Sequence, residues 1–173
     1  MTKLLLSIHV IVAILAVGPV AVAASVFPRS ARAAAAAGPG DAAALASLRT
    51  LHRICRVYAV LALLVPVFGF ATAAAMGVLG DAWLSASMVL TGIAGGVLAG
   101  LVLPLQDRVL RELTAPADAP VALPAGDTAV LLAPADRVRR DAAQLAMTVG
   151  VFNLLWATVT VLMVVRPGST TGA

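Results

Sequence analysis

The chain has 173 residues, of which 61% are hydrophobic and 12% are charged, and its mean hydropathy is +1.03. This composition is typical of a membrane protein and leaves no room for a separate soluble catalytic domain. The net charge of +4 sits in the connections between apolar segments. Membrane topology accounts for such charges, so no nucleic-acid partner is expected.

Four windows without Asp, Glu, Lys or Arg divide the chain, and they hold 25, 24, 25 and 24 residues. A helix of about 20 apolar residues crosses the hydrocarbon core of a bilayer, so each window is long enough. The sequence therefore predicts an all-α fold, a four-helix transmembrane bundle that forms one polytopic domain over residues 1–173. The expected helices cover about residues 4–27, 57–79, 82–105 and 142–165.

The first window also resembles a signal peptide, because Lys3 and an apolar run precede the small residues Ala21-Val22-Ala23. Cleavage there would place the next five arginines outside the cell, against the positive-inside rule. We therefore expect a retained helix, bent at Gly18-Pro19.

The connection over residues 28–56 contains a Gly38-Pro39-Gly40 break, after which Asp41 is placed to cap a helix that runs on into the second span. This segment carries an apolar stripe that can lie at the membrane interface, formed by Leu45, Leu48, Leu51 and Cys55. His52 stands among arginines, where a solvated or headgroup-level position is expected. Cys55 is the single cysteine, so no internal disulfide is expected.

The second and third spans are joined by a tight turn at Gly80-Asp81 and are predicted to pack as an antiparallel hairpin. Both carry small residues at four-residue spacing, which lets helix backbones approach closely in lipid. The predicted packing positions are Gly69, Ala73 and Gly77 on the second span and Gly92, Gly96 and Gly100 on the third. Packing within the bundle is favoured, and a dimerisation face remains the alternative.

Residues 106–141 contain four prolines and little apolar periodicity, which predicts a flexible cytoplasmic linker over about residues 114–134. The ends of this connection, Gln106–Leu113 and Asp136–Asp141, are expected to extend the third and fourth helices.

Ten of the twelve basic residues lie in the two long connections, which favours placing both connections in the cytoplasm and both termini outside the cell. Eleven arginines against one lysine, with abundant alanine, suggest a bacterial source of high GC content. The predicted location is the inner (plasma) membrane, with multiple passes. The expected partners are the lipid bilayer and, as alternatives within it, a second copy of the chain or another membrane protein.

His9 is the one ionisable side chain well inside a predicted span, and such residues are candidates for function. One residue from each span falls in the outer third of the membrane, and imidazole with thioethers suits Cu(I). The candidate metal ligands are His9, Met76, Met88 and Met163. The alternatives are a structural histidine and ordinary core methionines.

Asn153 lies near the middle of the fourth span, where an amide needs a partner inside the bundle, either a structural hydrogen bond or a polar path. His9 and His52 lie about 25 Å apart along the membrane normal, too far to share one haem iron. No cofactor is expected, and no catalytic motif supports an enzyme.

The stretch KLLLSIHVIVAILAVGPVAVAASVFPR resembles the first helix of a bacterial family of predicted integral membrane proteins, domain of unknown function 2269. LHRICRVYAVLALLVPVFGFATA and the MGVLGDAWL turn are similar to its second helix and hairpin. This resemblance implies a four-helix membrane protein without an assigned activity. A weaker likeness to copper-resistance D-type membrane proteins rests on His9, but the further intramembrane histidines are missing.

The expected function is thus that of a small integral membrane protein with a structural or partner-binding role. The alternative is binding or transport of a metal or small solute around His9.

Overall fold

The computed structural model describes residues 2–38, 41–115 and 134–168, and this part of the chain is entirely helical. The helices are α1 (Thr2–Ala37), α2 (Ala42–Leu61), α3 (Leu64–Met76), α4 (Ala82–Val97), the π-helical turn η1 (Leu98–Val102), α5 (Leu103–Thr114) and α6 (Pro134–Val165). The central part of the predicted linker, residues 116–133, lies outside the described residues.

Four helical units are long and apolar enough to cross a membrane, which confirms the predicted all-α class and the four candidate spans. They are α1, α2 with α3, α4 with η1 and α5, and α6, and each is 31 to 36 residues long. The helices therefore extend beyond the charge-free windows, mainly at the basic connections. Asp41 caps α2 as predicted, since its Oδ1 accepts hydrogen bonds from the amides of Ala43 and Ala44.

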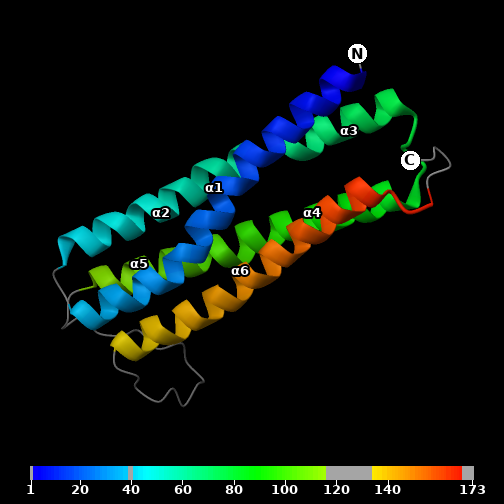
Figure 1. Ribbon diagram of the computed structural model, residues 1–173. Helices are drawn as coiled ribbons and strands as arrows, with labels where there is room; N and C mark the ends of the chain where they lie inside the picture. The colour runs from blue at the N-terminus through cyan, green and yellow to red at the C-terminus, as the bar shows by residue number, and fades with distance from the viewer. Residues whose placement is uncertain (1, 39–40, 116–133, 169–173) are drawn as a thin grey trace.

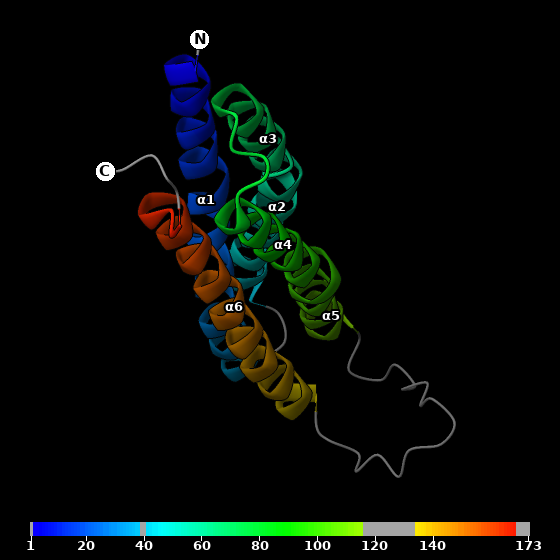
Figure 2. The same ribbon diagram turned by 90° about the vertical axis from the view of Figure 1, so that its right-hand side faces the viewer.

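The four units run alongside one another, with the start of α1 and the end of α6 at one end of the molecule (Figure 1). The junction of α1 with α2 and the facing ends of α5 and α6 lie at the opposite end, as the rotated view also shows (Figure 2). We call this second end the basic end, because ten of the twelve basic residues belong to the two connections there. The two long connections thus share one side of the bundle.

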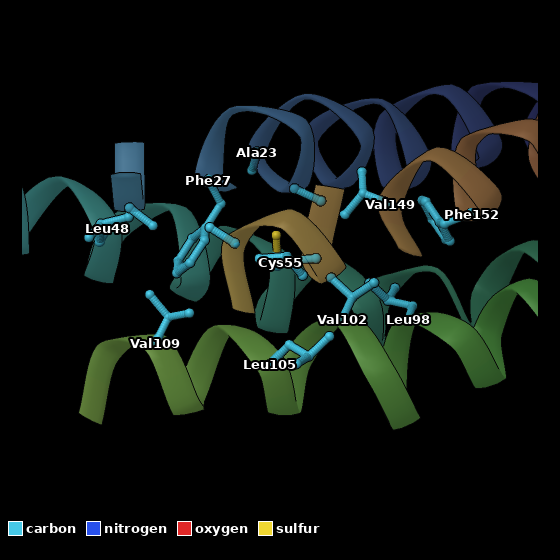
Figure 3. Packing of buried hydrophobic residues seen from close by; sticks show 14 of the residues in the cluster. Ala23, Phe27, Leu48, Cys55, Leu98, Val102, Leu105, Val109, Val149 and Phe152 are labelled. Atoms are coloured by element: carbon cyan, nitrogen blue, oxygen red, sulfur yellow. The ribbon is translucent and has the colours of Figure 1, made fainter. Parts of the chain in front are cut away.

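The main core lies toward the basic end, where α1, α2, α5 and α6 meet (Figure 3). Phe27 and Leu48 are fully buried there, together with Cys55 and Val109. The stripe of α2 that was predicted to lie at the membrane interface instead packs into this core. Its neighbours on α1 and α5 supply the apolar cover that an isolated amphipathic helix would seek from lipid.

A smaller cluster closes the opposite end, where Ala73 contacts Trp83 and Leu84, and Met163 packs against them. The indole of Trp83 donates a 2.8 Å hydrogen bond to Asp81, and the Arg166 guanidinium lies 5.7 Å from the indole ring. These contacts fasten the start of α4 to the end of α6.

The predicted hairpin packing between the two glycine ladders is not found in the structure. α3 packs mainly on α1 and α4 mainly on α6, while α3 and α4 touch only near their turn. Gly77 ends α3 in the left-handed conformation, with φ of 72°. Gly92, Gly96 and Gly100 are exposed, and a Cβ atom added to any of them would meet nothing within 4 Å.

Candidate functional site

His9 is buried against α3, in the apolar part of the bundle. A Cβ atom on Gly69 would lie 3.0 Å from the ring carbon Cε1 of His9, so the missing side chain of Gly69 makes room for the imidazole. Nδ1 of His9 is buried and makes no hydrogen bond of acceptable geometry with a described residue, although the backbone of Val65 lies near enough to interact with the ring. The small residue at position 69 therefore serves a contact between α1 and α3 rather than between α3 and α4.

The four predicted metal ligands have different surroundings. His9 contacts Gly69, whereas Met163 packs on the small cluster around Trp83. Met88 is 44% exposed on the outside of the bundle, and Met76 is half-buried at the end of α3. Copper binding by these residues stays a prediction.

Asn153 links two helices within the membrane-spanning part. Its Nδ2 donates a 3.2 Å hydrogen bond to the hydroxyl of Ser25, which joins α6 to α1. This bond agrees with the structural interpretation of Asn153, because an amide in hydrocarbon gains most from a partner on a neighbouring helix.

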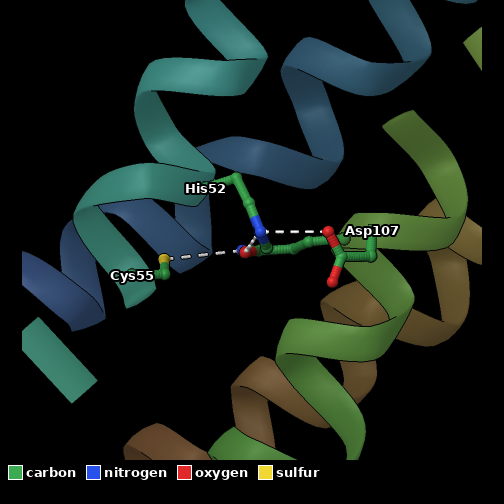
Figure 4. A network of polar contacts seen from close by, with 4 residues as sticks. His52, Cys55 and Asp107 are labelled. Atoms are coloured by element: carbon green, nitrogen blue, oxygen red, sulfur yellow. Dashed lines mark hydrogen bonds and ion pairs between the residues drawn. The ribbon is translucent and has the colours of Figure 1, made fainter. Parts of the chain in front are cut away.

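The most enclosed polar group of the described chain is a network between α2 and α5 (Figure 4). His52 is only 7% exposed, which corrects the expected solvated position. Its Nδ1 lies 2.9 Å from Oε1 of the fully buried Gln106, so Nδ1 carries the proton of that hydrogen bond. The Gln106 amide donates in turn to the Cys55 sulfur at 3.5 Å.

Asp107 completes this network at its outer edge. Its Oδ1 lies 3.1 Å from Nε2 of His52, and the Asp107 side chain is 48% exposed. The distance is that of an ion pair, although the ring nitrogen makes no hydrogen bond with acceptable angles. The network therefore leads from a half-exposed carboxylate through an imidazole to a buried amide and thiol.

The network can hold α2 against α5. His52 and Cys55 are three residues apart and so share one helix face, and Gln106 bonds to both through the two ends of its amide. Removal of Gln106 would leave the buried His52 donor unpaired, which costs about 1–3 kcal/mol. The described residues hold no cluster of three His, Cys, Asp or Glu side chains suited to a metal ion.

A second polar cluster joins α5 to α6. Arg137 lies 3.9 Å from Glu112, and Arg108 lies 3.8 Å from Asp141, whose side chain is only 10% exposed. Burial raises the pKa of Glu112, and the charge of Asp141 raises it further, whereas the nearby Arg137, Arg108 and Arg111 act in the opposite direction.

Sequence reasoning missed both clusters. One signal was present for the first: His52 continues the buried stripe of Leu48 and Cys55 at helical spacing, so it shares their face. Gln106 is the last residue of its charge-free window. Its position next to the predicted end of the span placed it in the extension of the third helix, where a buried partner was not expected.

Comparisons with known proteins place the chain in no family. No family model matches it, and neither a curated protein nor a solved structure is similar enough to count as a match. The resemblance to domain of unknown function 2269 stays a prediction.

Proposed function

We propose that this chain is a small plasma-membrane protein with a structural or partner-binding role, and that it associates with a second copy of itself through α4. The observation that carries the proposal is the open glycine face formed by Gly92, Gly96 and Gly100. Small residues at this spacing favour close contact between membrane helices, and no helix among the described residues covers them.

The polar groups of the described chain support the same view. The His52 network and the Glu112–Asp141 cluster join pairs of helices, and Asn153 does so within the membrane. Their contacts explain how the bundle holds together.

The test is the oligomeric state in lipid vesicles, measured by counting subunits of the labelled full-length chain. Gly96→Leu should convert dimers to monomers, because the larger side chain separates the two backbones. Gly150→Leu on α6 is the matched control, since Gly150 is also exposed with nothing within 4 Å of an added Cβ. A monomeric wild type, or dimers that persist in Gly96→Leu, would refute association through this face.

Metal or small-solute binding at His9 is a second candidate, favoured by the buried Nδ1 atom, which makes no hydrogen bond of acceptable geometry with a described residue. Imidazole nitrogen and thioether sulfur are ligands that Cu(I) accepts. If the site exists, the purified protein should bind Cu(I) in a competition assay, His9→Ala should abolish the binding, and Met88→Ala should weaken it. Absence of copper binding by the wild type would leave His9 with a packing role.

A further inference from the structure

The two basic connections differ in how their arginines are neutralised. On the α5–α6 side, arginines alternate with carboxylates and three ion pairs form, Arg108–Asp141, Arg137–Glu112 and Arg139–Asp136. The α1–α2 side carries five arginines with a single carboxylate, Asp41, which caps α2. Most of the uncompensated positive charge therefore belongs to α1 and α2.

Three of these arginines form one line on α2. Arg49, Arg53 and Arg56 are spaced four and three residues apart, so they share one helix face, and all three are exposed. None of the three has an ion pair or side-chain hydrogen bond with any described residue. We call this set the arginine stripe.

The stripe lies beside the buried face of the same helix and is turned from it by about 100°, the rotation that one residue gives. The buried residues Leu48, His52 and Cys55 hold α2 on the bundle, so the arginines one position further along face outward. Rotation of α2 could not hide the stripe without exposing the network of His52 and Gln106. The outward orientation is thus fixed by packing.

The same face becomes apolar toward the membrane centre. Exposed apolar side chains follow it along the chain: Val60 on α2, Leu63 in the turn before α3 and Val67 on α3 are 67%, 65% and 61% exposed. Arg56 stands directly before the charge-free window that these residues occupy. The stripe itself covers about 10 Å along the axis, seven residues at about 1.5 Å each, and the headgroup layer is roughly 5–8 Å thick.

We infer that the arginine stripe binds the phosphate groups of anionic phospholipids, whose acyl chains lie along Val60, Leu63 and Val67. Guanidinium groups bind phosphate oxygens through paired N–H donors, and three of them in line favour lipids with a net negative charge. Clustered basic residues beside a membrane helix attract anionic lipids in this way. The lipid is the partner, and no residue in the described part of the chain pairs with the stripe.

The experiment uses the full-length protein in nanodiscs that contain phosphatidylglycerol and phosphatidylcholine in equal amounts. Native mass spectrometry of the released protein gives the ratio of the two lipids that remain bound. The wild type should retain phosphatidylglycerol preferentially. The triple variant Arg49→Gln, Arg53→Gln, Arg56→Gln should lose this preference by up to about a hundredfold, since each of the three basic residues near an anionic surface contributes roughly a factor of five.

The matched control removes the same charge from the other connection, with Arg111→Gln, Arg139→Gln and Arg140→Gln. These three residues are also exposed, so this variant should keep the wild-type preference. An equal loss in both triple variants would show general attraction of the basic end and would overturn the assignment to α2. An unchanged preference in the stripe variant would overturn it as well.

If the triple variant does not fold, Arg53→Gln alone tests the same inference, because Arg53 is the middle residue of the stripe. The expected loss is then about fivefold, and no loss refutes the inference. The lipid ratio can also be measured on the Gly96→Leu variant, so failure of lipid binding is distinguishable from failure of the proposed dimer.

Discussion

The two histidines show how far a single residue can be interpreted without its neighbours. The position of His9 within an apolar window predicted an intramembrane imidazole, and the structure buries it. Its contact with Gly69 could not be predicted, because the sequence does not specify that α1 packs on α3. His52 stands among arginines in the sequence, yet the helical period turns it toward the core and the arginines away from it.

The contact between His9 and Gly69 predicts that the effect of Gly69→Ala on stability changes sign when His9 is removed. Gly69→Ala should destabilise the protein, because the added Cβ would lie 3.0 Å from the His9 ring. In a His9→Ala background the same change should stabilise it, since Ala is favoured over Gly in a helix by about 0.5–1 kcal/mol. Thermal unfolding in detergent measures both effects, with Gly92→Ala as the control that meets no neighbour. A loss of stability that persists without His9 would contradict this explanation.

The raised pKa of Glu112 predicts a pH dependence. A carboxyl group with a raised folded-state pKa binds its proton more strongly in the folded than in the unfolded protein. Its contribution to stability is therefore present below the ordinary value of 4.5 and is lost as pH rises through the higher folded-state value. We expect Glu112→Gln, which cannot ionise, to remove this loss.

The measurement is the difference in unfolding temperature between Glu112→Gln and wild type at a series of pH values from 4 to 8. The variant should gain stability relative to wild type as pH rises above 4.5. Asp136→Asn serves as the control, because the Asp136 side chain is 53% exposed on the surface of α6 and forms its ion pair with the exposed Arg139. A difference that stays constant across the series would contradict the assignment.

At the scale of the elements, charge-free windows predicted the existence of the four spans but not their full length. The helices extend past the windows at the basic end because their neighbours cover the buried stripes there, and Asp41 caps one of them. The glycine spacing predicted a face of small residues on α4, but it did not predict which helix would pack against that face. The turn after Met76 allows α3 and α4 to diverge, and nothing in the spacing of small residues opposes this.

The π-helical turn η1 is a second feature that the sequence did not predict. Along the third unit the buried residues Ser87 and Ala94 are seven positions apart, two helical turns, and then Leu98 and Val102 follow at steps of four. A wider turn accommodates one extra residue and keeps both flanking segments turned toward the core. The register of Gln106 toward His52 therefore depends on η1.

Deleting one residue should distinguish η1 from the regular helix. Removal of Gly100 should convert η1 to an ordinary α-helical turn and leave both flanks facing the core, so folded yield should fall little. Removal of Val89 from α4 should rotate the two flanks by about 100° relative to each other and prevent folding, since an α-helix has about 3.6 residues per turn. Both residues are exposed, which makes the pair a matched comparison. Equal yields would contradict a register role for η1.

The whole molecule is best packed at its basic end. The main core and both polar clusters lie there, while the opposite end is held by the small cluster around Trp83. The excess of basic residues and the larger core therefore lie at the same end of the bundle. The four candidate spans and their alternating direction could be predicted from the sequence. Each charge-free window is long enough to cross the bilayer once, so successive windows must run in opposite directions. The sequence did not predict that α1 packs on α3 and α4 on α6. Lipid is as apolar as the helix surfaces, so hydrophobicity alone does not select which helices pair.

The last prediction concerns the side on which the basic end lies. Ten of twelve basic residues sit in two connections that share one end of the bundle, and short basic loops favour the cytoplasm. A reporter fused after Ala173 should therefore be active only as an extracytoplasmic enzyme. The same reporter inserted within residues 116–133 should behave as cytoplasmic, and this opposite result is the internal control. A cytoplasmic signal from the C-terminal fusion, or mature protein that has lost residues 1–23, would refute a four-span chain with both termini outside.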